Sequence, residues 1–291
     1  MKIKFQDFKE LKNFPSGSGI ECFGEKVYLV GDDAKDILVM DKSWKKLDTI
    51  PLFVSAESRI PKKIKADLEA TTIIEVNSIP RMLVLGSGSK EPRNKALLIN
   101  LDDNSKEEFE IAEYYSRLKS AGIKMLNIES AVVILDKLLL GNRGNKTTPE
   151  NHLVLTDTDF WRHQSTAAIT TSIFELPVGT KPMAGLSGMA YSHLNDWLIA
   201  TMSTELTDNP VDDGPIGDSY LAIVENASRK ISHKRMRVNE LINLREADKV
   251  FRGYKIESVC IQSEKEGSLK LQLVADNDTG SSYLFKVRLK G

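Results

Sequence analysis

The chain has 291 residues and a mass of 32.5 kDa, and its 41% apolar and 28% charged residues suit a folded protein and exclude a disordered one. Lys and Arg number 40 and Asp and Glu number 41, so the net charge of −1 argues against nucleic acid or a membrane surface as the main partner. No apolar run reaches the roughly 18 residues of a membrane helix, no secretory signal is recognisable, and Cys22 and Cys260 are expected to be free thiols. We therefore expect a cytoplasmic location.

From the N-terminus onward, short alternating apolar runs bounded by Gly, Asp, Asn and Ser predict strands. The first covers residues 2–8, and after it one unit recurs five times. Each unit opens with an apolar residue followed by an acidic or small polar one, and the polar positions lie 48 to 70 residues apart. These positions are Glu21, Glu69, Glu129, Ser187 and Glu257. Such a period, with several strands per unit, is typical of β-propellers.

Further strands follow each opening position in chain order. Second strands are expected at residues 27–30, 82–85, 138–140, 197–200 and 271–275, and third strands at 37–40, 96–101, 152–156, 220–224 and 283–289. Outer strands are expected at residues such as 47–53 and 168–176. Residues 112–121 and 238–247 have helical composition and predict short helices in the connections between units.

The predicted fold is an all-β, five-bladed β-propeller with four-stranded antiparallel blades, forming a single domain over residues 1–291. The fifth unit lacks an outer strand, and the N-terminal strand at residues 2–8 could supply it. Such pairing of the two chain ends would close the ring and remove an exposed sheet edge.

The five opening positions predict a metal site, because the first strand of every propeller blade lines the central tunnel. Glu21, Glu69, Glu129, Ser187 and Glu257 would then form a ring of oxygen donors. Carboxylate and hydroxyl oxygens without His or Cys favour Ca²⁺, with Mg²⁺ less suited to a loose ring. The alternative is that these side chains bond to neighbouring amides, Lys and Arg.

The ring, together with the glycine-rich stretch at residues 83–91, resembles the calcium-activated nucleotidases (apyrases). The resemblance implies a five-bladed propeller that holds Ca²⁺ in its tunnel through one Glu or Ser from each blade. In that family the ring has two Ser and three Glu, whereas the pattern here gives four Glu and one Ser, with Glu21 where a Ser is expected. An uncharacterised bacterial propeller family with the same pattern is a second possible match.

The loops that follow the second strands should surround the ring, because antiparallel strands return to the same mouth of the tunnel. Blades two and three contribute groups suited to an anion, namely Ser87, Ser89, Lys90, Arg93, Asn142 and Arg143. Asp32, Asp276 and Asp278 are candidate catalytic carboxylates, although Asp is also common in turns. The long loop at residues 204–217, which contains Asp208 and Asp213, is expected to cover the site.

Three functions remain open from these observations. The first is a Ca²⁺-dependent hydrolase acting on a phosphate ester or a related anionic small molecule. The second is a propeller with a structural metal that binds a ligand or a protein partner without catalysis. The third is a hydrolase like the six-bladed sugar lactonases, which predicts six blades. Architecture cannot choose among them, because propellers carry many functions.

Overall fold

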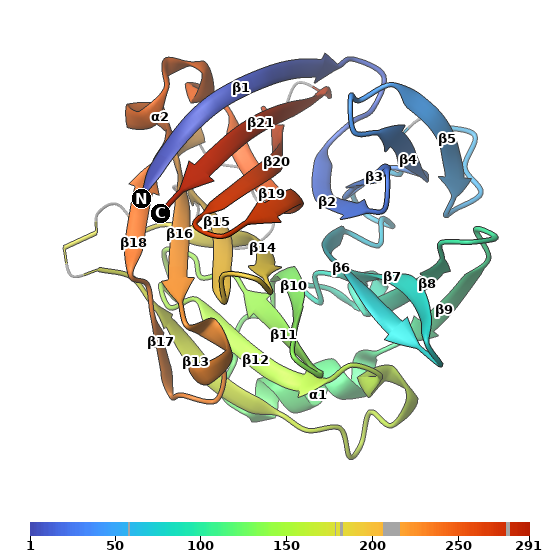
Figure 1. Cartoon of the computed structure of the whole chain (residues 1–291). Helices are drawn as coiled ribbons and strands as arrows, with labels where there is room; N and C mark the ends of the chain where they lie inside the picture. The colour runs from blue at the N-terminus through green and yellow to red at the C-terminus, as the bar shows by residue number, and fades with distance from the viewer. Residues whose placement is uncertain (58, 178, 181–182, 206–215, 278–279) are drawn as a thin grey trace.

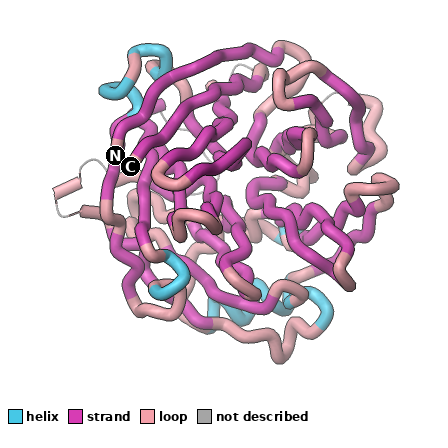
Figure 2. Tube along the Cα trace, viewed as in Figure 1, coloured by secondary structure: helices cyan, strands magenta, loops and turns pink. Residues whose placement is uncertain are grey.

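Five β-sheets are arranged around a central axis in the computed structural model, which describes the whole chain except residues 58, 178, 181–182, 206–215 and 278–279. Each sheet is one blade, and consecutive blades follow one another around the ring (Figure 1). The five-bladed propeller predicted from the sequence is therefore confirmed. The strands account for most of the described chain, and the helices lie at the periphery (Figure 2).

The first three blades are built from consecutive strands. Blade one contains β2 (Gly17–Phe23), β3 (Lys26–Gly31), β4 (Asp36–Asp41) and β5 (Lys46–Pro51). Blade two contains β6 (Leu68–Val76), β7 (Ile79–Gly86), β8 (Lys95–Asn100) and β9 (Lys106–Glu110). Blade three contains β10 (Ile128–Ile134), β11 (Lys137–Asn142), β12 (His152–Asp157) and β13 (Thr170–Glu175).

Blades four and five exchange strands with other parts of the chain. Blade four contains β14 (Gly185–Ser192), β15 (Trp197–Glu205), β16 (Ile216–Glu225) and β18 (Glu240–Asn243). Between its last two strands, β17 (Arg235–Arg237) pairs in parallel with β13 and adds a fifth strand to blade three. Blade five contains β19 (Lys255–Lys265), β20 (Ser268–Asp276), β21 (Ser282–Lys290) and the N-terminal β1 (Lys2–Leu11).

The N-terminal strand closes the ring as predicted. β1 runs antiparallel to β21 from the Lys2–Lys290 pair to the Leu11–Ser282 pair, and the two chain ends lie side by side (Figure 1). The outer edge of β21 is thus covered by the start of the same chain.

One predicted helix is confirmed and the other is largely wrong. The first is α1 (Ala112–Ser120), followed by the much shorter α2 (Leu244–Ala247) and by single 3-10 turns at Glu91–Arg93, Phe160–Arg162, Ala227–Arg229 and Lys249–Phe251. In the expected helix at residues 238–247, α2 covers the last four residues, and the four before them form β18, which pairs with β16 from Glu240–Ile223 to Asn243–Tyr220. The ladder bonds to a neighbouring strand outweigh the local helical composition.

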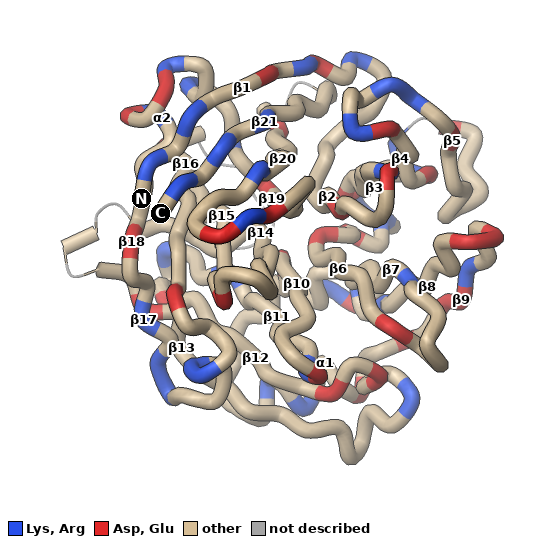
Figure 3. The backbone as a smooth tube through the Cα atoms, in the orientation of Figure 1, with Lys and Arg blue, Asp and Glu red and all other residues tan. Residues whose placement is uncertain are grey.

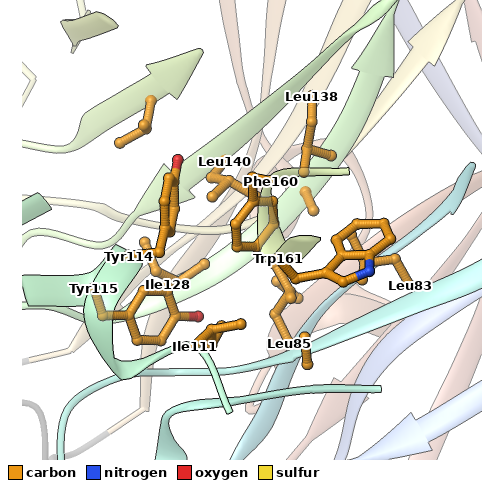
Figure 4. Close-up of a cluster of buried hydrophobic side chains, with 14 of the residues drawn as sticks. Leu83, Leu85, Ile111, Tyr114, Tyr115, Ile128, Leu138, Leu140, Phe160 and Trp161 are labelled. Atoms are coloured by element: carbon orange, nitrogen blue, oxygen red, sulfur yellow. The ribbon is translucent and has the colours of Figure 1, made fainter. Parts of the chain in front are cut away.

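The hydrophobic core lies between the blades. Between blades two and three, α1 contributes Tyr114 and Tyr115, which are buried with Phe160 and Leu85 (Figure 4). The rings of Tyr114 and Phe160 lie 4.3 Å apart. Similar clusters fill the other blade interfaces, so the ring is held together mainly by apolar packing from blade to blade.

Candidate functional site

A β-bulge interrupts the inner strand of every blade near its start. The pairing register shifts between Gly17 and Gly19, and at the corresponding places in β6, β10, β14 and β19. A bulge leaves one residue without a partner across the ladder and changes the direction of its side chain. The residues left over in this way are Ser18, Glu69, Glu129, Ser187 and Glu257.

Four of the five predicted ring positions therefore share one structural position, but Glu21 does not. The bulge of blade one falls at Ser18, and Glu21 lies three residues further along β2, opposite Tyr28. The sequence pattern of an apolar residue followed by an acid matched Ile20 and Glu21, whereas the bulge depends on how β2 pairs with β3. The corrected ring contains three Glu and two Ser.

The two serines of the ring connect neighbouring blades. Ser18 Oγ donates a hydrogen bond of 2.5 Å to the carbonyl oxygen of Leu68, and Ser187 Oγ donates one of 2.8 Å to the carbonyl oxygen of Ile256. In both cases the acceptor belongs to the residue just before the ring glutamate of the next blade. These hydroxyls therefore hold the bulges of adjacent blades in fixed relation.

A cluster of charged groups surrounds Glu69 near the start of the inner strand of blade two. Carboxylate oxygens of Asp32, Asp67 and Glu69 all lie within 4.8 Å of one another. The buried Lys65 ammonium is ion-paired with Asp32 and lies 2.7 Å from Asp67 Oδ1, and Arg93 Nη1 lies 2.5 Å from Asp67 Oδ2. Asp32 comes from the loop after β3, so strands from two blades meet here.

The three ring glutamates differ in how their charges are compensated. Glu129 lies 2.9 Å from Arg143 Nη1 and accepts a hydrogen bond from Asn127, and Glu257 lies 3.1 Å from Lys255 Nζ. Glu69 makes no hydrogen bond or ion pair with any residue that the structure describes. Burial, followed by the charges of Asp67, Asp32 and Glu129, raises the pKa of Glu69 well above its usual range.

The pKa of Asp32 is raised less than that of Glu69 and lies near neutral pH. Burial raises its pKa to about 6 despite the opposing charge of Lys65, and Asp33 and Asp67 contribute to the rise. The Oδ1 atom of Asp32 is buried and has no hydrogen-bond partner among the described residues. A carboxylate with such a pKa can exchange a proton near neutral pH.

The other predicted catalytic carboxylates are less well placed or lie outside the described residues. Asp276 is half-buried at the end of β20 and has interactions of its own. Asp278 is not among the described residues, and neither are Asp208 and Asp213 of the proposed covering loop. Their predicted roles therefore stay predictions.

Among the predicted anion-binding residues, three gather around Asp67. Ser87 Oγ donates to Asp67 over 2.6 Å, and Ser89 Oγ lies 2.7 Å from Arg93 Nη1. Lys90, in the same loop, is exposed. The structure thus brings the residues of this loop together, with Arg93 3% exposed and paired with a carboxylate.

Asn142 and Arg143 lie at the end of β11 in blade three, beside the ring residue Glu129. Asn142 is buried, and its side chain accepts from the amide of Asn127 and donates to the carbonyl oxygen of Met125. Arg143 reaches from Glu129 to Ser203 Oγ, at 2.9 Å from each. Both side chains therefore have structural partners as well as a place near the ring.

Lys65, Asp67 and Arg59 were missed by sequence reasoning. Arg59 lies 2.7 Å from Asp33 and donates to Ser16 Oγ. For Asp67 the sequence contained a signal, because the residue two positions before the ring residue is polar in four blades and has a polar contact near the site in each. These residues are Ser16, Asp67, Asn127 and Lys255.

The structure also contains a groove beside blade one. It has a volume of about 550 Å³ and runs between the end of β1 and the outer strands of blade one, lined by residues that include Phe14, Leu38, Trp44 and Lys46. Lys and Arg are interspersed with Asp and Glu over the outer strands, without a one-signed face in this view (Figure 3). None of the described helices is long and apolar enough to span a membrane.

Comparison with known proteins identifies the fold and a family. A model described as a family of unknown function, DUF6929, matches residues 13–289. No curated protein matches the chain. The structure is similar to the glutaminyl cyclase of Myxococcus xanthus, with a TM-score of 0.57, 10% identity and coverage of 99% of this chain and 96% of that one.

Further similar structures are more distant. A DUF4221 family member from Bacteroides vulgatus has a TM-score of 0.45 at 10% identity, with 100% and 99% of the two chains covered. A protein of unknown function from Dyadobacter fermentans has a TM-score of 0.47 at 6% identity, with 99% of each chain covered. At such identities the likeness concerns the fold, and none of these neighbours is described as a calcium-activated nucleotidase.

Proposed function

The chain belongs to this family of unknown function, DUF6929, and we propose that its tunnel mouth binds a divalent cation, Ca²⁺ in preference to Mg²⁺, and hydrolyses an anionic small molecule such as a phosphate ester. The proposed ligands are Glu69, Glu129 and Glu257, with Ser18 and Ser187 beside them. Five blades do not agree with the six-bladed lactonase alternative, which is therefore not carried forward.

The charge imbalance around Glu69 carries this proposal. Asp32, Asp67 and Glu69 share two cationic neighbours, Lys65 and Arg93. Three carboxylates and two cations leave one negative charge in a buried place without a cation to balance it. Ionising Glu69 in this place is therefore unfavourable, which is why its pKa is raised. Such a group can take up either a proton or a metal cation.

The donor chemistry also fits a hard cation. Ca²⁺ binds oxygen ligands at about 2.3–2.6 Å, so two of its ligands can lie up to about 5 Å apart. Among the described residues, Asp32, Asp67 and Glu69 meet this condition, so the distances support a cation beside Glu69, and Glu129 and Glu257 enter the proposal as members of the same ring. All the ring side chains offer oxygen. Three Glu and two Ser is also the ring composition that resemblance to the calcium-activated nucleotidases implies.

Hydrolysis would use groups that lie beside the ring. A bound cation would polarise an oxygen of the substrate and lower the pKa of a water molecule. Asp32, with a pKa of about 6, is suited to accept a proton from that water at neutral pH. Lys90 is exposed in the loop beside Ser89 and is suited to attract an anion to the mouth.

Thermal unfolding of the intact chain with CaCl₂, MgCl₂ or EDTA tests the cation site. Saturating Ca²⁺ should raise Tm by about 5 °C or more, because a ligand at 100 times its Kd adds about 2.7 kcal/mol of stability. Glu69→Gln should abolish the rise. Glu75→Gln, on the same strand but exposed, is the matched control and should keep it. A wild-type Tm indifferent to Ca²⁺, or a shift that survives Glu69→Gln, would contradict the proposal.

A panel of nucleotides, sugar phosphates and carboxylic esters, assayed with Ca²⁺, tests the chemistry separately. Turnover that requires Ca²⁺ and falls at least tenfold in Asp32→Asn supports hydrolysis. The second candidate is a binding propeller without catalysis, and the engagement of Arg93 and Arg143 with carboxylates favours it. Ca²⁺ binding without turnover of any compound would support that second function.

A further inference from the structure

Two cysteines face each other across the seam where the first and last blades meet. Cys22 lies on β2 and Cys260 on β19, the inner strands of blades one and five. Their Sγ atoms are 2.7 Å apart, although the residues are separated by 238 positions in the sequence. This approach is near the roughly 2.05 Å of a disulfide bond.

The seam around the two thiols is fixed by several other contacts. Trp44 Nε1 donates to Gln272 Oε1 over 2.5 Å, and Gln272 is the ladder partner of Cys260. The Lys286 ammonium lies 3.9 Å from the centre of a Trp44 ring. Cys260 also belongs to the buried cluster that joins blades one and five. Because these contacts hold blades one and five together around the thiols, the sulfur atoms can bond without a rearrangement of the strands.

We propose that Cys22 and Cys260 form a reversible disulfide that locks the ring covalently at the seam between blades one and five. This modification site is independent of the cation site at the tunnel mouth. The oxidant is a low-molecular-weight disulfide such as oxidised glutathione.

The order of the two steps follows from exposure. Cys22 is partly exposed and Cys260 is 2% exposed, so the Cys22 thiolate reaches the external disulfide first. Its attack forms a mixed disulfide and releases one glutathione thiolate. Cys260 then attacks the Cys22 sulfur, the second glutathione leaves as a thiolate, and the Cys260 proton passes to that thiolate. Two protein thiols are oxidised, and one glutathione disulfide is reduced to two thiols.

Burial and the neighbouring Cys22 raise the pKa of the Cys260 thiol, which supports this order. A buried thiol of high pKa is protected from oxidants of its own, and only a partner sulfur already in contact with it can react. The same burial protects the finished bond from bulky reductants, so small dithiols should reverse it most readily.

The bond would stabilise the ring by restricting the unfolded chain. Joining residues 238 positions apart closes most of the 291-residue chain into one loop, and longer loops give the larger entropic stabilisation. The native ring should change little, because the sulfur atoms already lie together.

The test uses the intact chain equilibrated with glutathione buffers, alkylated and analysed by mass spectrometry without reduction. We expect a loss of about 2 Da, a linked peptide containing Cys22 and Cys260, and a rise in Tm of roughly 5–10 °C that dithiothreitol reverses. Cys22→Ser and Cys260→Ser should show neither the linked peptide nor the Tm rise.

Three results would overturn the inference. A stable glutathione adduct at Cys22 without the linked peptide would show that Cys260 does not resolve it. Two alkylated thiols after prolonged oxidation would show that the pair is unreactive. A linked peptide without a Tm rise would show that the bond does not lock the ring. Peptide mapping of the wild-type chain needs no variant to fold, so the test does not depend on the serine substitutions.

Discussion

Glutamates on the inner strands of the blades differ because their neighbours differ. Glu21 has one hydrogen-bond donor of its own, the hydroxyl of Thr71 at 3.0 Å, and no cation pairs with it among the described residues. Burial outweighs this hydrogen bond and raises the pKa of Glu21 to about 8. Glu129, by contrast, has Arg143 beside it. At neutral pH, a pKa of about 8 leaves Glu21 mostly in its neutral form.

Glu21→Gln should stabilise the protein in a pH-dependent way. Below about pH 4.5 the side chain is protonated in both the folded and unfolded states. Between pH 4.5 and 8 the unfolded chain ionises and the folded chain does not, so wild-type stability falls as pH rises through this window. Glutamine does not titrate, and the variant should become more stable than wild type by about 1–3 kcal/mol at pH 8–9, allowing for water in the tunnel.

Urea unfolding at intervals from pH 4 to pH 9 measures this difference. Glu25→Gln, on an exposed side chain in the turn after the same strand, is the control and should show no such trend. A stability difference that stays constant over the whole range would mean that Glu21 has an ordinary pKa.

At the scale of strands and helices, much of the fold was predictable because each strand carries its own local signal. Alternation and turn residues identified the inner, second and third strands of every blade, and the helix at α1 followed from composition. What could not be predicted depends on partners far away in the sequence. β18 forms because β16 is beside it, β17 crosses to blade three, and the bulge at Ser18 depends on the register between β2 and β3.

The candidate site, like the fold, was predictable where a local sequence pattern marks its residues. Glu69, Glu129, Ser187 and Glu257 were found because a bulge recurs at a regular position in each inner strand. Lys65 was missed, because only the fold brings it between two acids from different blades.

The bulge serines provide a test of how adjacent blades are connected. Ser18→Ala and Ser187→Ala each remove a buried hydrogen bond to a backbone carbonyl of the next blade, and each should cost about 1–2 kcal/mol of unfolding free energy. The two bonds lie at different interfaces, so the double variant should lose close to the sum. Chemical denaturation of the three variants measures these losses.

Ser130→Ala is the matched control for these substitutions. Ser130 follows the bulge residue Glu129 directly and is equally buried, but its hydroxyl has no hydrogen-bond partner among the described residues. Its removal should be neutral or slightly stabilising. Equal losses for Ser18→Ala, Ser187→Ala and Ser130→Ala would mean that packing, and not the bonds between blades, sets the cost.

For the whole molecule, ring closure depends on a strand from the opposite end of the chain. β1 covers β21, and its Phe5 and Phe8 contact the rings of Phe251 and Phe285 with centroid distances of 6.4 Å and 5.0 Å. Without β1, the edge of β21 would expose unpaired backbone groups and part of this aromatic cluster. The connection from β1 to β2 also ties blade five to blade one covalently.

A circular permutation separates the contribution of the strand from that of the covalent connection. Lys2 and Lys290 are paired at the end of the β1–β21 ladder, so the two chain ends are close together. A short glycine–serine linker can therefore join residue 291 to residue 1. A permutant that begins at residue 13 keeps every strand but breaks the connection to blade one. We expect it to be monomeric and to unfold cooperatively, with a Tm lowered by several degrees, because packing holds the seam.

Deletion of residues 1–12 should instead give aggregation or loss of the cooperative transition, since it uncovers β21. Size-exclusion chromatography and calorimetry distinguish these outcomes, and a deletion variant that remains monomeric with the wild-type Tm would show that β1 does not close the ring.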